Sequence, residues 1–330
     1  MDKISVIIPC RNEEKYIGLC LDSIINNDYP REFMEVIVVD GESSDKTRDI
    51  ISNFTNKYNF IKLIINERKT VPFALNFGIN NSNGDFIFIL GAHSDIPKNY
   101  FSKLVEYSIK LNADNVGGVC RTRVRKITSK TNSIIKVLSN KFGVGNSFFR
   151  IGSDEVKEVD NISFGCFRKS VYQEIGYYDT RLERNQDIEL NKRLKKSGRK
   201  IYLVPDVYFT YYAREKFSGL AKNNFQTGLW NILTVYFTRN INSISIRHLV
   251  PLIFLLSLIL PIIIWLWVPS VWLISLISLL LYFLCLIIIS YSLNDNTSSF
   301  FNILISFIVL HFSYGTGSLI GLFRIDALFK

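Results

Sequence analysis

The sequence predicts an α/β protein: a doubly wound, mainly parallel sheet with flanking helices, followed by a C-terminal bundle of about three transmembrane helices. Two observations lead to this prediction. Short β-branched runs alternate with segments of helical apolar spacing through residues 4–90, and such alternation is typical of parallel sheets. From residue 251 onward the charged residues are few and their charges sum to zero: Asp295, Arg324, Asp326 and Lys330.

The predicted elements of the sheet follow one another as two units of alternating strand and helix. Between residues 14 and 26 the apolar positions recur at helical spacing, as at Ile17, Leu21 and Ile24. In chain order we expect a strand at 4–8, a helix at 14–26, a strand at 36–39, a helix at 47–57, a strand at 61–65, a helix at 71–80 and a buried strand at 86–90. Parallel sheets of this kind bind ligands at the carboxyl ends of their strands.

Polar residues follow three of these strands, at 9–14, 40–45 and 91–95, and are expected to converge on one crevice. The first strand is not followed by GxGxxG, and GxxxxGKS does not occur, so neither a dinucleotide fold nor a P-loop is indicated. Residues 115–165 are less regular, and their glycine-rich loops suggest a substrate-facing flap. The basic stretch at 121–130 is equally consistent with an ordinary surface connection.

The net charge of +10 falls entirely on residues 1–250. A basic surface suits nucleic acid, an anionic membrane or a phosphorylated substrate. Neither zinc-finger spacing nor a basic zipper occurs, and a basic run at 193–200 precedes an apolar tail, so we expect no nucleic acid partner. Five cysteines without a CxxC pair indicate a reducing compartment. The apolar stretch within the first ten residues is too short, and is followed too soon by polar residues, to be the core of a signal peptide. This predicts that the N-terminus lies in the cytosol.

Three apolar runs, at 249–268, 271–291 and 300–323, are each close to the roughly 20 residues that a membrane span needs. Only Pro269 and Ser270 separate the first two, which predicts a tight helical hairpin. The third run contains His311 and several glycines. Helix packing through those glycines is one interpretation, and a groove for a lipid phosphate with His311 near the headgroup is the other. Arg239 and Arg247 flank the first span on the side of the soluble part.

These patterns predict a multi-pass protein of the cell (inner) membrane whose catalytic domain, residues 1–215, is cytoplasmic. Residues 216–248 are expected to form amphipathic helices at the membrane interface, and residues 249–330 a transmembrane domain. Packing of the aromatic residues of 217–237 into a core is the competing interpretation.

Four side chains that follow strands or begin a helix have chemistry suited to a site. Asp40 could accept a hydrogen bond from an N–H donor such as a uracil nitrogen, or could simply form the turn that follows its strand. His93 and Asp95 could hold Mg²⁺ or Mn²⁺, although a loop histidine is more often a surface residue. Asp187, in the first turn of a helix expected at 183–194, could act as a general base or merely favour the helix dipole.

The pattern as a whole resembles glycosyltransferase family 2, whose members have the GT-A fold. The matching pieces occur in order through residues 4–200, and include SVIIPCRNEEKYIGLCLDSI, EVIVVDGESSDKT, GAHSDIPKNY and RLERNQDIELNKRL. More narrowly, the segments ADNVGGV, FGVGNSFFR and RLERNQDIELN are similar to bacterial exopolysaccharide enzymes of the succinoglycan-synthesis type.

The resemblance implies a role for particular residues. Asp187 would be the catalytic base, Asp40 would hold the uracil, and His93 with Asp95 would lie at the metal. The residues implied to line the donor nucleotide are Pro9, Arg11, Glu13, Lys69 and Ala92. Those implied on the acceptor side are Gly165, Cys166, Gln226 and Trp230.

The chain departs from the family pattern at three positions. Gly91 stands where the first aspartate of the metal motif is usual, which puts ordinary metal coordination in doubt. Gln186 replaces a glutamate beside the base, and the lost negative charge should let Asp187 ionise at least as easily. Leu229 replaces the arginine of the QxxRW signature of processive synthases, which favours transfer of a single sugar.

Together these features predict inverting transfer of one sugar from a nucleotide-diphosphate sugar, expected to be a UDP-sugar, to a lipid-linked saccharide in exopolysaccharide or cell-surface glycan synthesis. One alternative is a polyprenyl-phosphate sugar synthase. The other is a membrane scaffold that binds nucleotide with weakened catalysis. The sequence indicates membrane lipids as a partner and does not identify a protein partner.

Overall fold

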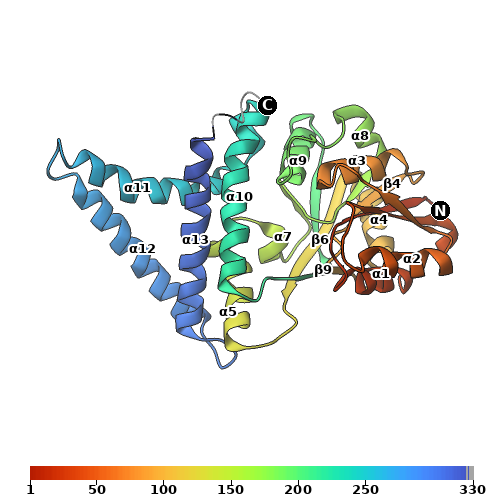
Figure 1. Cartoon of the computed structure of the whole chain (residues 1–330), viewed down its shortest axis with the longest axis horizontal. Helices are drawn as coiled ribbons and strands as arrows, with labels where there is room; N and C mark the ends of the chain where they lie inside the picture. Colours follow the sequence, from red (N-terminus) through yellow and green to blue (C-terminus); the bar gives the residue numbers. More distant parts are fainter. Residues whose placement is uncertain (325, 327–330) are drawn as a thin grey trace. The chain divides into compact units, whose positions relative to one another are not determined.

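The computed structural model describes residues 1–324 and 326, and the chain divides into two compact units (Figure 1). The sheet unit consists of residues 1–121 and 147–212. The helical unit consists of residues 122–146 and those from 213 onward. A segment from the middle of the chain is therefore part of the C-terminal helical unit.

The first half of the sheet is parallel, as predicted. Strand β1 (Ile4–Cys10) pairs with β2 (Met34–Asp40) and β4 (Phe86–Ile89), and β2 pairs with β3 (Ile61–Ile65). The connecting segments hold α1 (Ile17–Ile25), the short 3-10 turn η1 (Arg31–Phe33), α2 (Thr47–Lys57) and α3 (Val71–Asn80). The β-branched side chains of β1 and β2 are almost entirely buried, because helices cover both faces of a parallel sheet.

The second half of the sheet is antiparallel, which the alternation of strands and helices did not specify. β4 pairs with β8 (Cys166–Arg168), which pairs with β6 (Asn115–Arg123). Beyond β6 lies β9 (Ile201–Tyr212), whose partners include β5 (Ser94–Asp95) and β7 (Lys157–Glu158). The nine strands follow the order β3-β2-β1-β4-β8-β6-β9-β5, with β7 beside β9. The helices of this half are α4 (Tyr100–Lys110), α7 (Phe148–Ile151), α8 (Lys169–Ile175) and α9 (Gln186–Lys196). The α/β prediction is confirmed, with a sheet that is mixed.

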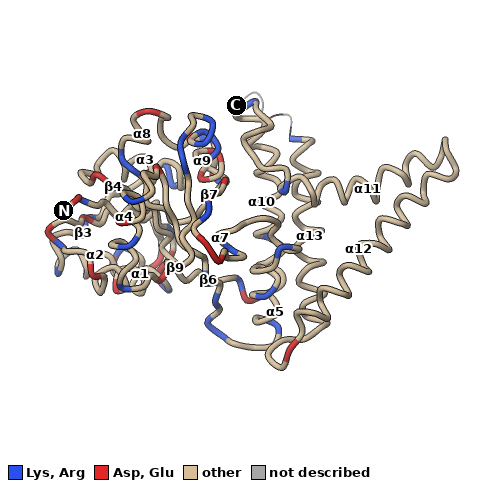
Figure 2. The backbone as a smooth tube through the Cα atoms, turned by 180° about the vertical axis from the view of Figure 1, so that it is seen from behind, with Lys and Arg blue, Asp and Glu red and all other residues tan. Residues whose placement is uncertain are grey.

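Three apolar helices occupy the segments predicted to span a membrane: α11 (Val250–Ile264), α12 (Trp272–Leu293) and α13 (Phe300–Leu322). Among the described residues, α12 and α13 are long and apolar enough to cross a bilayer. The 15 residues of α11 are about 22 Å long, which is shorter than the hydrocarbon core. α11 and α12 form a hairpin without Lys, Arg, Asp or Glu (Figure 2).

Helix α10 (Phe217–Thr238) packs lengthwise against α13, and the two helices run side by side in Figure 1. Glycines allow this approach: a Cβ atom at Gly228 would lie 2.0 Å from the backbone oxygen of Tyr314, and one at Gly317 would lie 2.0 Å from that of Phe225. The glycines of α13 therefore serve helix packing. Two 3-10 turns, η2 (Ile241–Ser243) and η3 (Ile246–His248), connect α10 to α11.

His311 does not present its ring nitrogens to a lipid groove. Its Nδ1 lies 3.2 Å from the hydroxyl of Tyr282, and its Nε2 lies 2.8 Å from the backbone oxygen of Phe142. The lipid-phosphate interpretation of His311 is therefore not supported, because both nitrogens already have partners inside the helical unit.

Residues 122–146 form α5 (Ser129–Leu138) and α6 (Lys141–Val144), which belong to the helical unit. The ammonium group of Lys136 lies 2.7 Å from a carboxylate oxygen of Asp295, and Asn132 donates to the backbone oxygen of Thr297. Both partners are in the loop between α12 and α13. Residues 122–146, the middle of the segment 115–165 that was expected to form a flap, are thus attached to the apolar helices.

Candidate active site

A cavity of about 490 Å³ lies within the sheet unit, beside the carboxyl ends of β1 and β4. Residues from distant parts of the chain line it, because parallel strands bring their ends to one edge of the sheet. The predicted site residues that line it are Pro9, Arg11, Glu13, Lys69, Ala92, His93, Gly165 and Asp187. The structure therefore gathers the expected base and most of the expected donor residues around one hollow.

Several expected residues do not line this cavity. Cys166 is fully buried in β8, and Asp95 is in the short strand β5, where its register partner in β9 is Thr210. Gln226 and Trp230 are in α10 of the helical unit. Asp95 therefore does not line the cavity beside His93, and the pairing of these two residues at a metal stays a prediction.

Asp40 is also absent from the cavity lining, since its side chain is 0% exposed. Its Oδ2 accepts a 2.9 Å hydrogen bond from the backbone N–H of Ser43, and its Oδ1 accepts one from the Ser43 hydroxyl. The thiol of Cys10 lies 3.8 Å from the same carboxylate, and burial together with Asp40 raises the pKa of that thiol. Asp40 thus forms the turn after β2, and its neighbours Cys10 and Gly41 are the residues that reach the cavity.

The loops after β1 and β2 are joined by hydrogen bonds. The backbone N–H of Asn12 donates to the Ser43 hydroxyl at 2.8 Å, and that of Glu13 donates to the Thr47 hydroxyl at 2.7 Å. The Asn12 side chain in turn accepts from the backbone N–H of Ser44. These contacts hold Arg11 and Glu13 at the cavity edge, so the turn built by Asp40 supports the donor side indirectly.

Left-handed backbone conformations gather at the cavity. Seven non-glycine residues have positive φ in the described chain, and three of them, Lys69 (62°), Phe164 (53°) and Asn185 (62°), line the cavity. Asn12 and Glu42 each follow a lining residue. Such conformations cost energy and persist where surrounding contacts enforce them, which is common at functional sites.

Asp187 lies in the first turn of α9, half-buried on the cavity wall. Burial raises the pKa of its carboxyl group, while the backbone N–H of Ile188 and the positive charge of Arg150 act in the opposite direction. The glutamine at 186 removes one possible cause of a raised pKa, but burial still dominates. A carboxylate with a raised pKa is a stronger base than an exposed one.

Two further polar atoms lie on the cavity wall, one of them on Thr70, which the sequence did not single out. Thr70 Oγ1 and Gln186 Oε1 are buried and have no hydrogen-bond partner among the residues that the structure describes. Buried polar atoms are normally satisfied, so a ligand with hydroxyl or N–H groups would complete them.

A chain of buried amides anchors α9. Asn115 donates to Asn191 Oδ1 at 3.0 Å, and Asn191 donates to Asn161 Oδ1 at 2.5 Å. Asn191 is one helical turn after Asp187 on the same face of α9 and also lines the cavity. The amides come from β6, α9 and the loop before β8, so they fix the helix that carries the expected base.

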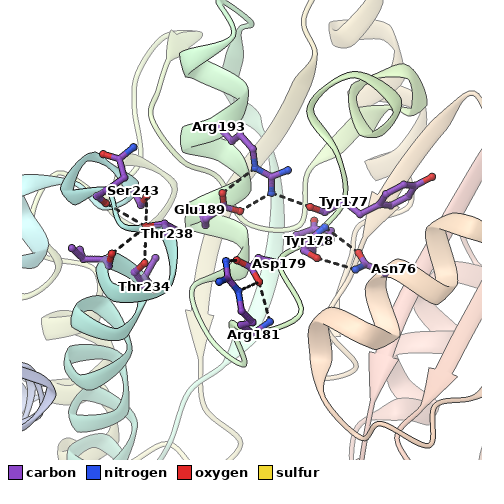
Figure 3. Close-up of polar contacts among 12 residues, drawn as sticks. Asn76, Tyr177, Tyr178, Asp179, Arg181, Glu189, Arg193, Thr234, Thr238 and Ser243 are labelled. Carbon is purple, nitrogen blue, oxygen red and sulfur yellow. Dashed lines mark hydrogen bonds and ion pairs between the residues drawn. The ribbon is translucent and has the colours of Figure 1, made fainter. Parts of the chain in front are cut away.

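Figure 3 shows a second set of anchors around the loop that precedes α9. Asn76 exchanges two hydrogen bonds with the backbone of Tyr178, at 2.9 and 3.0 Å. Arg193 binds the carboxylate of Glu189 and donates to the backbone oxygen of Tyr177 at 2.9 Å. The Asn76–Tyr178 contacts connect residues 102 positions apart in sequence, and no motif pointed to them.

The residues present do not fit a metal site made by protein ligands alone. His93 Nδ1 lies 3.6 Å from Glu13 Oε1, but within the described part of the chain no three His, Cys, Asp or Glu side chains gather to hold an ion. Gly91 contributes no side chain. A divalent ion normally needs more ligands than this pair supplies.

Comparison with known proteins agrees with this geometry. The family model described as "Glycosyl transferase family 2" matches residues 5–176, just over half of the chain. A curated relative from Methanococcus voltae, a dolichyl N-acetyl-alpha-D-glucosaminyl phosphate 3-beta-D-2,3-diacetamido-2,3-dideoxy-beta-D-glucuronosyltransferase, is 34% identical over 69% of this chain and 72% of its own length. The succinoglycan biosynthesis protein ExoA of Rhizobium meliloti is 25% identical over 64% of this chain and 63% of its own.

Solved structures share the fold. The mannosyltransferase PcManGT from Pyrobaculum calidifontis, solved with GDP-Man and Mn²⁺, has a TM-score of 0.60 at 15% identity and is aligned over 95% of this chain and 87% of its own. TarS of S. aureus, solved with UDP-GlcNAc, has a TM-score of 0.51 at 16% identity, over 96% and 90%. The predicted GT-A fold and the predicted family are both confirmed: the chain belongs to glycosyltransferase family 2 and is a glycosyltransferase.

Proposed function

We propose that this enzyme transfers one sugar, with inversion, from a UDP-sugar to a lipid-linked saccharide at the inner face of the cell membrane. The observation that carries the proposal is a carboxylate with a raised pKa, Asp187, in the same cavity as the cationic side chains of Arg11 and Lys69. Such a cavity holds a base for the acceptor and positive charge for a departing diphosphate.

In the proposed reaction Asp187 takes the proton of an acceptor hydroxyl while that oxygen attacks the anomeric carbon of the donor. The bond between the anomeric carbon and the β-phosphate oxygen breaks, and the diphosphate leaves with the electron pair. Arg11, which follows β1, and Lys69, which precedes α3, both line the cavity and stabilise the negative charge of the diphosphate. Attack opposite the leaving group inverts the anomeric configuration. The orphan oxygens of Thr70 and Gln186 would accept hydrogen bonds from donor or acceptor hydroxyls.

Asp40 as the residue that binds uracil remains part of the proposal, although its carboxylate points to Ser43. Cys10 and Gly41 surround it and line the cavity, so a base that reached Asp40 would have to displace part of this turn. Ala92 and Pro9 would complete the donor wall. On the acceptor side we propose Gly165, which lines the cavity, with the buried Cys166 beside it and with Gln226 and Trp230 of α10.

The proposed placement is a cytoplasmic catalytic domain of residues 1–215, interfacial residues 216–248, and membrane residues 249–330. The apolar α12 and α13 support the membrane part, since each is long enough to span a bilayer. The name of the M. voltae relative gives a dolichyl-linked sugar phosphate as its acceptor, which supports a lipid-linked acceptor here. The neighbour PcManGT, solved with Mn²⁺, supports Mg²⁺ or Mn²⁺ as a cofactor.

The test is transfer by the purified full-length chain, in detergent, from a panel of nucleotide sugars to a lipid-linked saccharide and, separately, to bare polyprenyl phosphate. The Asp187→Asn variant should bind UDP as tightly as the unchanged protein, and its kcat should be lower by about 10²–10⁴-fold. Retained turnover would refute the role of Asp187. Transfer to polyprenyl phosphate alone would establish a polyprenyl-phosphate sugar synthase instead, and UDP binding without transfer from any donor would establish a scaffold.

A further inference from the structure

Residues 122–146, which we call the basic segment, carry positive charge that the segment itself does not balance. They include six Lys and Arg residues and neither Asp nor Glu. The six are Arg123, Arg125, Lys126, Lys130, Lys136 and Lys141. All except Lys136 are exposed, and Figure 2 shows Lys and Arg along α5 and along the chain that leads to it. The segment therefore presents a strongly cationic surface within the helical unit.

The basic segment is attached at the loop that joins α12 to α13. The ammonium group of Lys136, which pairs with Asp295 of this loop, also donates at 2.7 Å to the backbone oxygen of Leu293, the last residue of α12. Both helices are long and apolar enough to cross a bilayer, so the loop between two such spans lies at the membrane surface. Two exposed aromatic residues flank the loop, Tyr291 and Phe301, as is typical of a membrane–water interface.

The chain that leads into α5 exposes an aliphatic side chain among its cations. Ile127 is 76% exposed and lies between Lys126 and Lys130 in the sequence. The carboxylate of Glu215 accepts hydrogen bonds from the backbone N–H groups of Arg125 and Lys126, at 2.8 and 2.9 Å, which fixes this part of the chain. An exposed apolar side chain surrounded by cations is typical of surfaces that enter the interface of an anionic bilayer.

A cavity of about 550 Å³ lies where the basic segment meets the last turns of α12. Its lining residues are Asn140, Lys141 and Phe142 of the basic segment, and Ile288, Ile289, Ser292 and Leu293 of α12. Whereas Lys136 pairs with Asp295, the exposed ammonium group of Lys141 has no hydrogen-bond or ion-pair partner within the described part of the chain. A lysine beside an apolar wall at the end of a span suits a molecule with an anionic headgroup and a hydrocarbon chain.

We propose that the basic segment binds anionic phospholipids of the membrane surface, with the phosphate of one lipid at Lys141 and part of an acyl chain in the cavity beside α12. A phospholipid supplies both the negative charge for the exposed cations and the apolar surface for Ile288 and Ile289, whereas a soluble anion supplies only the charge. The inference rests on the membrane placement proposed above, and goes beyond it by naming the class of lipid and the residues that select it.

Binding of short-chain lipids to the full-length chain in a neutral detergent tests the proposal, by native mass spectrometry. Dioctanoyl phosphatidylglycerol should bind at least about tenfold more tightly than dioctanoyl phosphatidylcholine. Lys141→Gln, and separately Lys126→Gln with Lys130→Gln, should remove most of this preference without lowering the Tm. Lys110→Gln is the matched control, because Lys110 is an exposed lysine of the sheet unit. Equal affinities of the unchanged protein for the two lipids would overturn the proposal.

Two competitors separate a phospholipid from other sources of phosphate. Inorganic phosphate, added at constant ionic strength, should leave the binding of phosphatidylglycerol nearly unchanged, and complete displacement would instead establish a site for soluble anions. Polyprenyl phosphate should not replace phosphatidylglycerol selectively. If its binding depends on Lys141 while that of phosphatidylglycerol does not, the segment holds the acceptor lipid and the proposal is wrong.

A spin label at position 127 tests whether this part of the chain enters the bilayer. The label is attached to Ile127→Cys in a chain that also carries Cys285→Ser, because Cys285 is exposed and the four other cysteines are buried. In nanodiscs that contain phosphatidylglycerol, the label should be accessible to oxygen and protected from a water-soluble nickel chelate. A label at Lys110→Cys should remain accessible to the chelate. Equal accessibility of both labels to the chelate would contradict the proposal.

Failure of this inference is distinguishable from failure of the proposed function. Release of the chain from membranes by an alkaline carbonate wash would contradict the proposed membrane placement. A chain that resists the wash but binds phosphatidylglycerol and phosphatidylcholine alike would contradict only the inference about anionic lipids.

Discussion

Asn191→Ala should destabilise the protein strongly, although the residue contributes neither charge nor apolar surface. Asn191 is 1% exposed and joins Asn115, which is 0% exposed, to Asn161, which is 6% exposed. Alanine would leave the amide of Asn115 and the amide oxygen of Asn161 buried without these partners. An orphaned buried polar group costs about 1–3 kcal/mol, so two cost about 2–6 kcal/mol. At about 2 °C per kcal/mol for a chain of this size, the Tm should fall by about 4–12 °C.

The assay is thermal unfolding of the full-length chain in detergent, with sugar-transfer activity from the UDP-sugar donor measured on the same preparation well below the Tm. The matched control is Lys192→Ala at the next position, which removes one partly exposed ion pair with Asp160 at 3.6 Å and should cost about 1 kcal/mol or less. Because Asn191 fixes the helix that carries Asp187, kcat should fall in Asn191→Ala while KM for the donor changes little. Equal Tm values for the two variants would show that the amide chain does not anchor α9.

The other predictions concern the base, the nucleotide pocket and the helix contact. Burial raises the pKa of Asp187 above its ordinary value of 3.8, so in a profile of kcat/KM against pH the activity should be lost, on the acid side, at a pH above that value. Gln186→Glu adds a negative charge beside Asp187 and should move this loss of activity to a still higher pH. Because folding favours the protonated carboxyl, the ionised group destabilises the protein at neutral pH, and Asp187→Asn should raise the Tm there while abolishing turnover; a lower Tm would contradict the raised pKa. Asp40→Asn should weaken UDP binding by about tenfold, measured by calorimetry, if the Asp40 carboxylate binds the uracil of UDP. A lower Tm with unchanged UDP affinity would show that Asp40 only stabilises the turn after β2. Gly317→Ala should lower the Tm because its Cβ would lie 2.0 Å from the backbone oxygen of Phe225, whereas Gly18→Ala, whose Cβ would meet only Ile50 at 3.6 Å, should leave it unchanged or slightly higher.

The bounds of several elements could be predicted because they depend on local pattern. The helix expected at 47–57 is α2 and the one expected at 71–80 is α3, since apolar spacing and β-branched runs specify element type wherever one face is buried. The antiparallel strands β6, β8 and β9 had no such signal, because their pairing depends on partners far away in the chain. For the same reason the attachment of residues 122–146 to the apolar helices was not apparent from the sequence.

By itself the sequence determined the fold class, the family, the three apolar helices and the group of residues at strand ends, because composition, spacing and strand order fix these features. Only the tertiary structure decided which of those residues meet. It buried Asp40 under its own turn, took Asp95 out of the cavity, and brought Phe164 against Gly91. Side-chain direction and contact between distant segments arise from packing of the whole sheet unit, and a linear pattern does not contain that information.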